Sequence, residues 1–147
     1  MSQKIFLASD HGGFKLKEYL QLYLVRLGYD VVDMGNHKLD KTDDYPDFVI
    51  PAVKRALKNK SRAIVICRSG VGACIAANKV KGAYAVHADS VRLARQSREH
   101  NNTNILCLGA DSLNRETAGR VVRTWMTTKF ENGRHLRRIR KIQRIEK

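Results

Sequence analysis

A short apolar run that ends in a cysteine and a glycine-rich turn constrains the fold of this chain most. The run spans residues 63–66 (Ala-Ile-Val-Ile), Cys67 follows it, and residues 68–72 (Arg-Ser-Gly-Val-Gly) form the turn. Residues 73–79 are then typical of a helix. A short apolar segment closed by glycines and followed by a helix predicts a buried parallel strand that leads into a helix N-terminus.

The same alternation of strand-like and helix-like segments runs along the whole chain. It predicts an α/β fold, a Rossmann-like three-layer sandwich in which helices cover both faces of a five-stranded parallel sheet. With 147 residues and no Pro/Gly/Ser-rich linker, we expect one domain over residues 1–147. The expected strands are 4–8, 29–33, 63–66, 83–86 and 104–108, and the expected helices are 14–27, 46–57, 73–79, 91–100, 117–130 and 135–145.

The cysteine count and the absence of a long apolar run predict a protein of the cytoplasm. No stretch of about 18 apolar residues occurs, so we expect no membrane span. The N-terminus lacks a secretory signal pattern. Cys67, Cys74 and Cys107 are odd in number and lack zinc-site spacing, which favours free thiols in a reducing cytoplasm. Cys74 and Cys107 fall in apolar elements, and we expect both in the core.

The formal net charge is +14, and the C-terminal segment is its most basic part. Residues 134–147 carry seven Lys or Arg side chains and one acidic residue, Glu146. Such a run is compatible with a solvated helix, with non-specific binding of a polyanion, or with a clamp for a phosphorylated small molecule. Aromatic residues do not alternate with the basic ones, which argues against specific nucleic-acid recognition.

Cys67 is the principal candidate for chemistry. Its place before a helix N-terminus gives it a positive potential that favours the thiolate, so it could serve as nucleophile or general base; the alternative is a buried, inert cysteine. Ser69 could shuttle a proton, cap the helix, or do both. A phosphatase loop would need an arginine where Ala73 stands, and neither thioredoxin-like nor P-loop spacing is present.

Two further polar clusters stand at predicted element ends. Asp10 and His11 follow the first strand, where they could hold a substrate hydroxyl and a phosphate, or merely cap a helix. His100 and Asn101 end a predicted helix, where they could supply an acid and an amide, or cap that helix. His37, His87 and His135 have no evident partners in the sequence.

Six blocks in this order resemble the ribose-5-phosphate isomerase B family, which includes the bacterial galactose-6-phosphate isomerase subunits. Together they extend over nearly the whole chain. The blocks are Ser9 to Gly13, Asp44 to Asp47, Ile66-Cys67 with Ser69 to Gly72, Ile75 to Lys79, His100-Asn101 with Thr103-Asn104, and Gly133 to His135 with Arg138.

The resemblance implies an aldose–ketose isomerase of the pentose phosphate pathway that uses no metal and no cofactor. It would interconvert ribose 5-phosphate and ribulose 5-phosphate as a homodimer, possibly a tetramer, with sites between subunits and the C-terminal helix extending to the partner. Cys67 would be the base, while Ser69 and His100 would assist ring opening. The substrate would contact Asp10, His11, Tyr45, Asn101, Arg134, Arg138 and the amides of Gly70, Val71 and Gly72.

Two departures from the family pattern carry opposite charges. Arg68 stands where the family usually has glycine, and Asp111 stands where it usually has arginine. We hypothesise that Arg68 replaces the missing positive charge or pairs with Asp111; alternatively, Arg68 points to solvent. A six-carbon substrate such as allose 6-phosphate or galactose 6-phosphate, and a basic module that binds polyanions, are the alternative functions.

Overall fold

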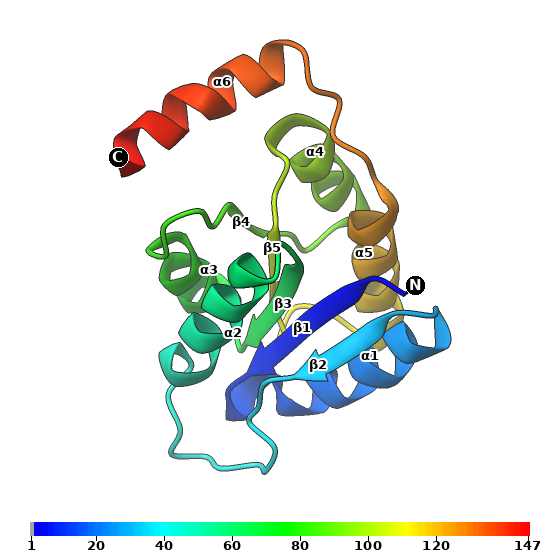
Figure 1. The fold of residues 1–147 in the computed structure, drawn as a ribbon. Helices are drawn as coiled ribbons and strands as arrows, with labels where there is room; N and C mark the ends of the chain where they lie inside the picture. Colours follow the sequence, from blue (N-terminus) through cyan, green and yellow to red (C-terminus); the bar gives the residue numbers. More distant parts are fainter. Residues whose placement is uncertain (1) are drawn as a thin grey trace.

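The computed structural model describes residues 2–147 and contains one five-stranded, all-parallel sheet (Figure 1). The strands lie in the order β2-β1-β3-β5-β4, so β3 is central and Cys67 ends it. This confirms the predicted α/β fold and the number of strands. The strands are β1 (Lys4–Ser9), β2 (Asp30–Asp33), β3 (Arg62–Cys67), β4 (Ala85–His87) and β5 (Ile105–Gly109).

Helices cover both faces of the sheet, as the alternation predicts. Helices α1, α4 and α5 pack on one face, and α2 and α3 pack on the other. The α-helices are α1 (Phe14–Arg26), α2 (Pro46–Lys58), α3 (Val71–Asn78), α4 (Val91–Asn101), α5 (Arg115–Thr127) and α6 (Arg134–Gln143), with short 3₁₀ turns η1 (His11–Gly13) and η2 (Arg144–Glu146).

Side-chain alternation along the strands builds two cores. In β1, Ile5 and Leu7 face α1 and α5, whereas Phe6 and Ala8 face α2. Because both faces are covered, the central strands are apolar on both sides, and residues 63–67 are almost wholly buried. The central strands are thereby fixed, which gives the polar residues at their ends a rigid support.

Sequence and structure differ at a few element ends. The fourth strand begins at Ala85 rather than Ala83, and α5 ends at Thr127 because Thr128 is extended.

Cys107 is fully buried, as expected, but Cys74 is only half-buried. A hydrogen bond with the Cys107 thiol lowers the pKa of Cys74 to about 7, and burial raises the pKa of Cys107.

Helix α6 stands away from the sheet and arches over the amino ends of the strands (Figure 1). His135 and Ile139 are buried on its inner side. Ile142 in α6 and Ile145 in η2 remain 45% and 83% exposed, so the last turns present an exposed apolar strip. None of the helices within residues 2–147 is long and apolar enough to cross a membrane.

Candidate functional site

The carboxyl edge of the sheet gathers the first group of predicted site residues. Parallel pairing sets Ser9 beside Ile66 and Cys67 beside Gly109, so β1, β3 and β5 end at one edge. Asp10 and His11 follow β1, the glycine turn follows β3, and Asp111 follows β5. This is the edge at which open parallel sheets bind ligands.

Cys67 lies at the centre of this edge, with its sulfur held by the turn. The Gly70 amide donates a hydrogen bond to Cys67 Sγ at 3.1 Å, and the residue is 4% exposed. This hydrogen bond fixes the position of the sulfur at the start of the turn. The N-terminus of α3 follows directly, so the sulfur lies where a negative charge is stabilised.

The glycines of the turn are required by their surroundings. Gly70 has φ +82°, and a Cβ there would lie 2.7 Å from His87 Nε2 and 2.9 Å from the Gly109 amide nitrogen. A Cβ on Gly72 would lie 2.5 Å from the ring of Tyr45. Tyr45 therefore lies directly over the start of α3, beside the turn. His87, to which the sequence analysis gave no role, packs against Gly70.

Asp10 and Ser69 both accept hydrogen bonds from nearby backbone amides. Asp10 caps η1: it is 7% exposed, and its carboxylate accepts from the Gly13 amide at 3.2 Å. Ser69 is exposed, and its Oγ accepts from the Val71 amide at 3.2 Å within the turn, whereas the N-cap of α3 is Gly70. Each side chain keeps acceptor capacity on its oxygens, so these hydrogen bonds are compatible with substrate binding.

Asp43 is a site residue that the sequence analysis missed. Its Oδ1 accepts from the His11 backbone amide at 2.9 Å and lies 2.6 Å from His11 Nδ1, while Asn36 donates to its other oxygen. The Asp43 hydrogen bond raises the pKa of His11 above its ordinary value, and the charge of Asp10 raises it further. Asp43 lies 32 residues from His11, and no spacing rule connects the two.

A cationic cavity opens beside His11. Its volume is about 410 Å³, and its lining includes His11, Lys15, Lys41 and Arg68. Arg68 Nη1 lies 3.7 Å from Asp111 Oδ2, with the two side chains 67% and 60% exposed. The hypothesised pairing of these residues therefore exists as an exposed ion pair, and Arg68 also adds positive charge to the cavity. Lys15 and Lys41 were not among the predicted residues.

The second group of predicted residues lies at the opposite edge. The rings of His100 and His135 stack with centroids 4.3 Å apart, joining the end of α4 to the start of α6. Burial lowers the pKa of His135, and the neighbouring His100, Arg134 and Arg138 lower it further. His135, which had no evident partner in the sequence, thus joins three predicted site residues in one basic cluster.

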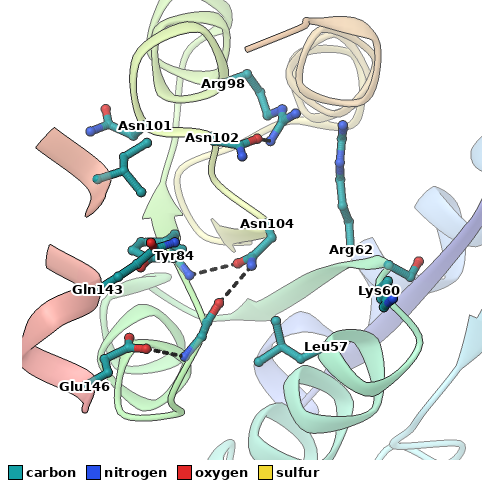
Figure 2. A pocket seen from close by; sticks show the side chains of 13 residues that line it. Leu57, Lys60, Arg62, Tyr84, Arg98, Asn101, Asn102, Asn104, Gln143 and Glu146 are labelled. Carbon is teal, nitrogen blue, oxygen red and sulfur yellow. Dashed lines mark hydrogen bonds between the residues drawn. The ribbon is translucent and has the colours of Figure 1, made fainter. Parts of the chain in front are cut away.

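Two cavities adjoin this second group. One, of about 570 Å³, lies between the amino ends of the strands and α6 and includes Asn101 in its lining (Figure 2). Asn104 donates to the Gly82 carbonyl there, and Glu146 accepts from the Gly82 amide at 3.0 Å, which ties η2 to the body. The other, of about 460 Å³, is lined by both His100 and Asn101.

The two groups cannot meet within one chain. Residues 63–67 of β3 pair in register with 105–109 of β5, so Cys67 lies at the carboxyl end. His100 and Asn101 end α4, which returns to the amino end before β5 begins. Four residues of strand span about 13 Å, so one edge is remote from the other. One substrate can contact both groups only if two copies of the chain contribute.

Two clusters within residues 2–147 have the composition of a metal site: Asp10-His11-Asp43 and His100-Glu131-His135. In the first, Asp43 Oδ1 lies against His11 Nδ1, and the raised pKa of His11 favours the imidazolium. Lys15, Lys41 and Arg68 add positive charge nearby. This edge of the sheet therefore suits an anion better than a metal cation.

Comparisons with known proteins identify the family of this chain. The ribose/galactose isomerase family model matches residues 5–142. A probable ribose-5-phosphate isomerase B of Mycoplasma genitalium is 43% identical over 149 residues, covering 100% of this chain and 98% of the relative. Ribose-5-phosphate isomerase B of Escherichia coli is 38% identical over 145 residues, covering 98% and 97%.

Solved structures give the same result for the fold. Ribose-5-phosphate isomerase B of Clostridium thermocellum superposes with a TM-score of 0.95 at 42% identity, covering 98% of this chain and 97% of that one. The Mycoplasma genitalium enzyme with bound ribulose 5-phosphate also gives 0.95 at 42% identity, covering 99% and 97%. The resemblance inferred from six sequence blocks is confirmed: this chain belongs to the ribose/galactose isomerase family.

Proposed function

We propose that this protein interconverts D-ribose 5-phosphate and D-ribulose 5-phosphate, with Cys67 as the base. The observation that carries the proposal is the position of Cys67 Sγ, at the exit of the central strand and hydrogen-bonded to the amide of Gly70. A cationic cavity on the same edge is lined by Arg68, the residue that follows Cys67, together with His11. The similarity to the Mycoplasma genitalium enzyme that binds ribulose 5-phosphate supports the substrate.

The reaction requires a proton to move between two adjacent carbons. In the open-chain aldose, the Cys67 thiolate takes the proton from C2, and the electrons of that bond pass to the carbonyl oxygen on C1. The resulting enediolate is stabilised by the amides of the turn at the N-terminus of α3. The thiol then returns the proton to C1, while the hydroxyl proton on O2 passes to the oxyanion on C1 and the electrons of the O2–H bond form the carbonyl at C2, so the ketose results. No redox cofactor takes part in this proton transfer.

Phosphate binding positions the sugar. His11, held by Asp43 and carrying a raised pKa, is a good phosphate ligand because its imidazolium pairs with the dianion. Arg134 and Arg138 lie four residues apart on one face of α6 and can approach one phosphate together. Binding the phosphate, which does not react, orients C1 and C2 at Cys67.

We further propose that the complete site lies between two copies of the chain. Cys67, Asp10, Ser69 and Tyr45 come from the carboxyl edge of one copy. The amino-edge group of a second copy supplies His100, Asn101, Arg134 and Arg138, with α6 extending to the partner. The support is the separation of the two groups within one chain and the exposed apolar strip formed by Ile142 of α6 and Ile145 of η2.

One assay tests the activity directly. Ketose formation from ribose 5-phosphate is measured in the presence of EDTA, in parallel with allose 6-phosphate as a six-carbon substrate. We expect turnover of ribose 5-phosphate, and a loss of several orders of magnitude in kcat for Cys67→Ser. Cys74→Ser is the matched control, since it removes the half-buried thiol of α3 and retains turnover. Full turnover by Cys67→Ser would refute the role of the base, and turnover of the six-carbon sugar alone would refute the substrate.

A mixing experiment tests the shared site. Cys67→Ser and His100→Asn proteins, each inactive alone, are unfolded together, refolded at equal amounts and assayed. In a mixed dimer, one of the two sites retains both residues, so random pairing restores about a quarter of wild-type activity. If each chain carried a complete site, mixing would restore nothing, and the shared-site proposal would fail.

A further inference from the structure

Two arginine side chains without an acidic partner line the cavity at the amino edge of the sheet. Arg62 begins β3 and Arg98 lies in the last turn of α4, and both belong to the lining of the cavity of about 570 Å³ (Figure 2). Arg98 is 5% exposed, and Arg62 is partly buried. The sequence analysis gave neither residue a role.

Contacts with the protein hold both guanidinium groups in place. Arg62 Nη1 donates to the Trp125 carbonyl at 3.2 Å, and Arg62 Cζ lies 5.4 Å from the centroid of the Trp125 ring. Arg98 Nε donates to the Thr128 carbonyl at 3.3 Å, and Arg98 Nη1 donates to Asn102 Oδ1 at 3.0 Å. Within residues 2–147, Nε and Nη2 of Arg62 and Nη2 of Arg98 have no hydrogen-bond partner, so these donors remain for a ligand.

The two positive charges are not neutralised. Burial, and next the charge of Arg62, lower the pKa of Arg98 to about 10, and burial also lowers the pKa of Arg62. Both groups still carry their charge at neutral pH, so two like charges lie near each other in a partly desolvated place. Within residues 2–147, no carboxylate stabilises either charge. An anion bound to both groups would therefore lower their electrostatic free energy.

The rest of the lining is cationic on balance. Lys60, which is exposed, adds a third positive charge to the cavity. Glu146 is the one acidic residue in the lining, and its Oε2 accepts from the Gly82 amide at 3.0 Å. In Figure 2, Glu146 lies across the cavity from Arg62 and Arg98, so its carboxylate does not compete for the two guanidinium groups.

We propose that Arg62 and Arg98 form a binding site for a phosphate group, carried by inorganic phosphate or by a small phosphate monoester. The planar donors of a guanidinium match the oxygens of a phosphate, and a dianion balances the charges of both arginines, which one carboxylate does not. The site is distinct from the cavity beside His11, which lies at the opposite edge of the sheet. Among the residues proposed to contact the sugar, Asn101 alone also lines this cavity. The phosphate site does not rest on the proposed isomerase function.

Calorimetric titration of the full chain with inorganic phosphate measures the binding. We expect two phosphates per chain, one beside His11 and one at the arginine pair. Arg62→Gln should weaken the second by about tenfold or more and leave the first unchanged, whereas His11→Asn should do the reverse. Arg120→Gln is the matched control, because it removes the same charge from an exposed position on α5; both affinities should stay at their wild-type values.

A parallel titration with glycerol 3-phosphate identifies the carrier of the phosphate group. Tighter binding of glycerol 3-phosphate at the arginine pair assigns the site to a monoester, and equal or weaker binding assigns it to inorganic phosphate. Acetate should not bind there, because its single charge leaves one arginine unbalanced. Acetate binding as tight as that of phosphate would overturn the proposed ligand.

A second variant keeps the test valid if Arg62→Gln fails to fold. Lys60 is exposed and its side chain makes no hydrogen bond within residues 2–147, so Lys60→Gln should fold and weaken the second phosphate a few-fold. Wild-type affinity at the second site in Arg62→Gln would overturn the proposal. If Arg62→Gln does not fold, wild-type affinity in Lys60→Gln would overturn it.

Turnover separates this proposal from the proposed function. Arg62→Gln should retain wild-type turnover of ribose 5-phosphate, because Arg62 does not contact the sugar. Active protein that binds a single phosphate, lost in His11→Asn and kept in Arg62→Gln, would overturn the second site and leave the isomerase proposal standing. A protein without turnover whose bound phosphate is lost in Arg62→Gln would overturn the isomerase proposal and support the arginine site.

Discussion

Replacing Gly70 by alanine tests whether the glycine turn is as tightly constrained as its contacts indicate. Gly70 has φ +82°, and its missing Cβ would lie 2.9 Å from the Gly109 amide nitrogen and 2.7 Å from His87 Nε2. Gly28, which follows α1, is a matched control. Its φ of +93° is similar, but a Cβ there has no heavy atom within 4 Å. Both substitutions therefore carry the free-energy cost of placing alanine at a positive φ, and only Gly70→Ala adds close contacts of the new Cβ.

The expected magnitudes follow from these two contributions. A left-handed conformation costs a non-glycine residue about 1–2 kcal/mol, and this applies to both variants. The added methyl at Gly70 also displaces the Gly109 backbone and the His87 ring, which costs about 1–3 kcal/mol more. Gly28→Ala should lower the free energy of unfolding by about 1–2 kcal/mol and Gly70→Ala by about 2–5 kcal/mol. For a chain of this size, Tm should fall by about 2–8 °C and about 4–20 °C respectively.

Thermal unfolding and steady-state turnover of the two purified variants form the assay. Gly70→Ala should also lower kcat by about 10²-fold, because the amide that binds Cys67 Sγ and its neighbours in the turn are displaced. Gly28→Ala should retain wild-type kcat below its Tm. Equal Tm values for the two variants, together with unchanged turnover by Gly70→Ala, would refute the argument from close contact.

Two further predictions concern the charges around the phosphate cavity. Asp43→Asn removes the hydrogen bond that raises the pKa of His11, so His11 should lose its proton at a lower pH than in wild type. As the pH increases, the KM of the variant should therefore begin to rise at a lower pH than the KM of wild type. The exposed Asp30→Asn is its control, and superimposable KM–pH profiles for Asp43→Asn and wild type would contradict the assignment. Asp111→Ala should lower KM a few-fold at low salt by releasing Arg68, and Arg68→Ala should raise it. An increase in KM for Asp111→Ala would show that the pair supports binding as a unit.

Much of the fold was accessible from the sequence because its signals are local. Apolar runs such as 63–66 and 105–108 are bounded by glycines and polar residues, and helical periodicity marks the segments between them. The boundaries that were misplaced depend on hydrogen bonds between distant segments. Ala83 and Tyr84, for example, are excluded from β4, where the Tyr84 amide bonds to the Asn104 side chain instead of extending the strand.

The candidate site was accessible only in part. Cys67, Ser69 and the turn could be identified because they are contiguous, and Asp10 with His11 because they end a strand. Asp43, Lys15 and Lys41 approach His11 through a loop whose path no periodicity encodes. The same holds for Glu131 and His135, whose convergence with His100 depends on the turn at Asn132 and Gly133.

The sequence by itself determined that this chain forms a parallel α/β sheet with a cysteine at the exit of a buried strand, because strand and helix periodicities and glycine turns act over a few residues. Only the tertiary structure decided the edge at which each polar group lies. It placed His100 and Asn101 at the amino edge, opposite Cys67, since α4 runs back along the sheet before β5 begins. Strand order and the direction of each return helix arise from packing across the whole core, and these long-range contacts separate His100 and Asn101 from the residues that the sequence had placed at the strand exits.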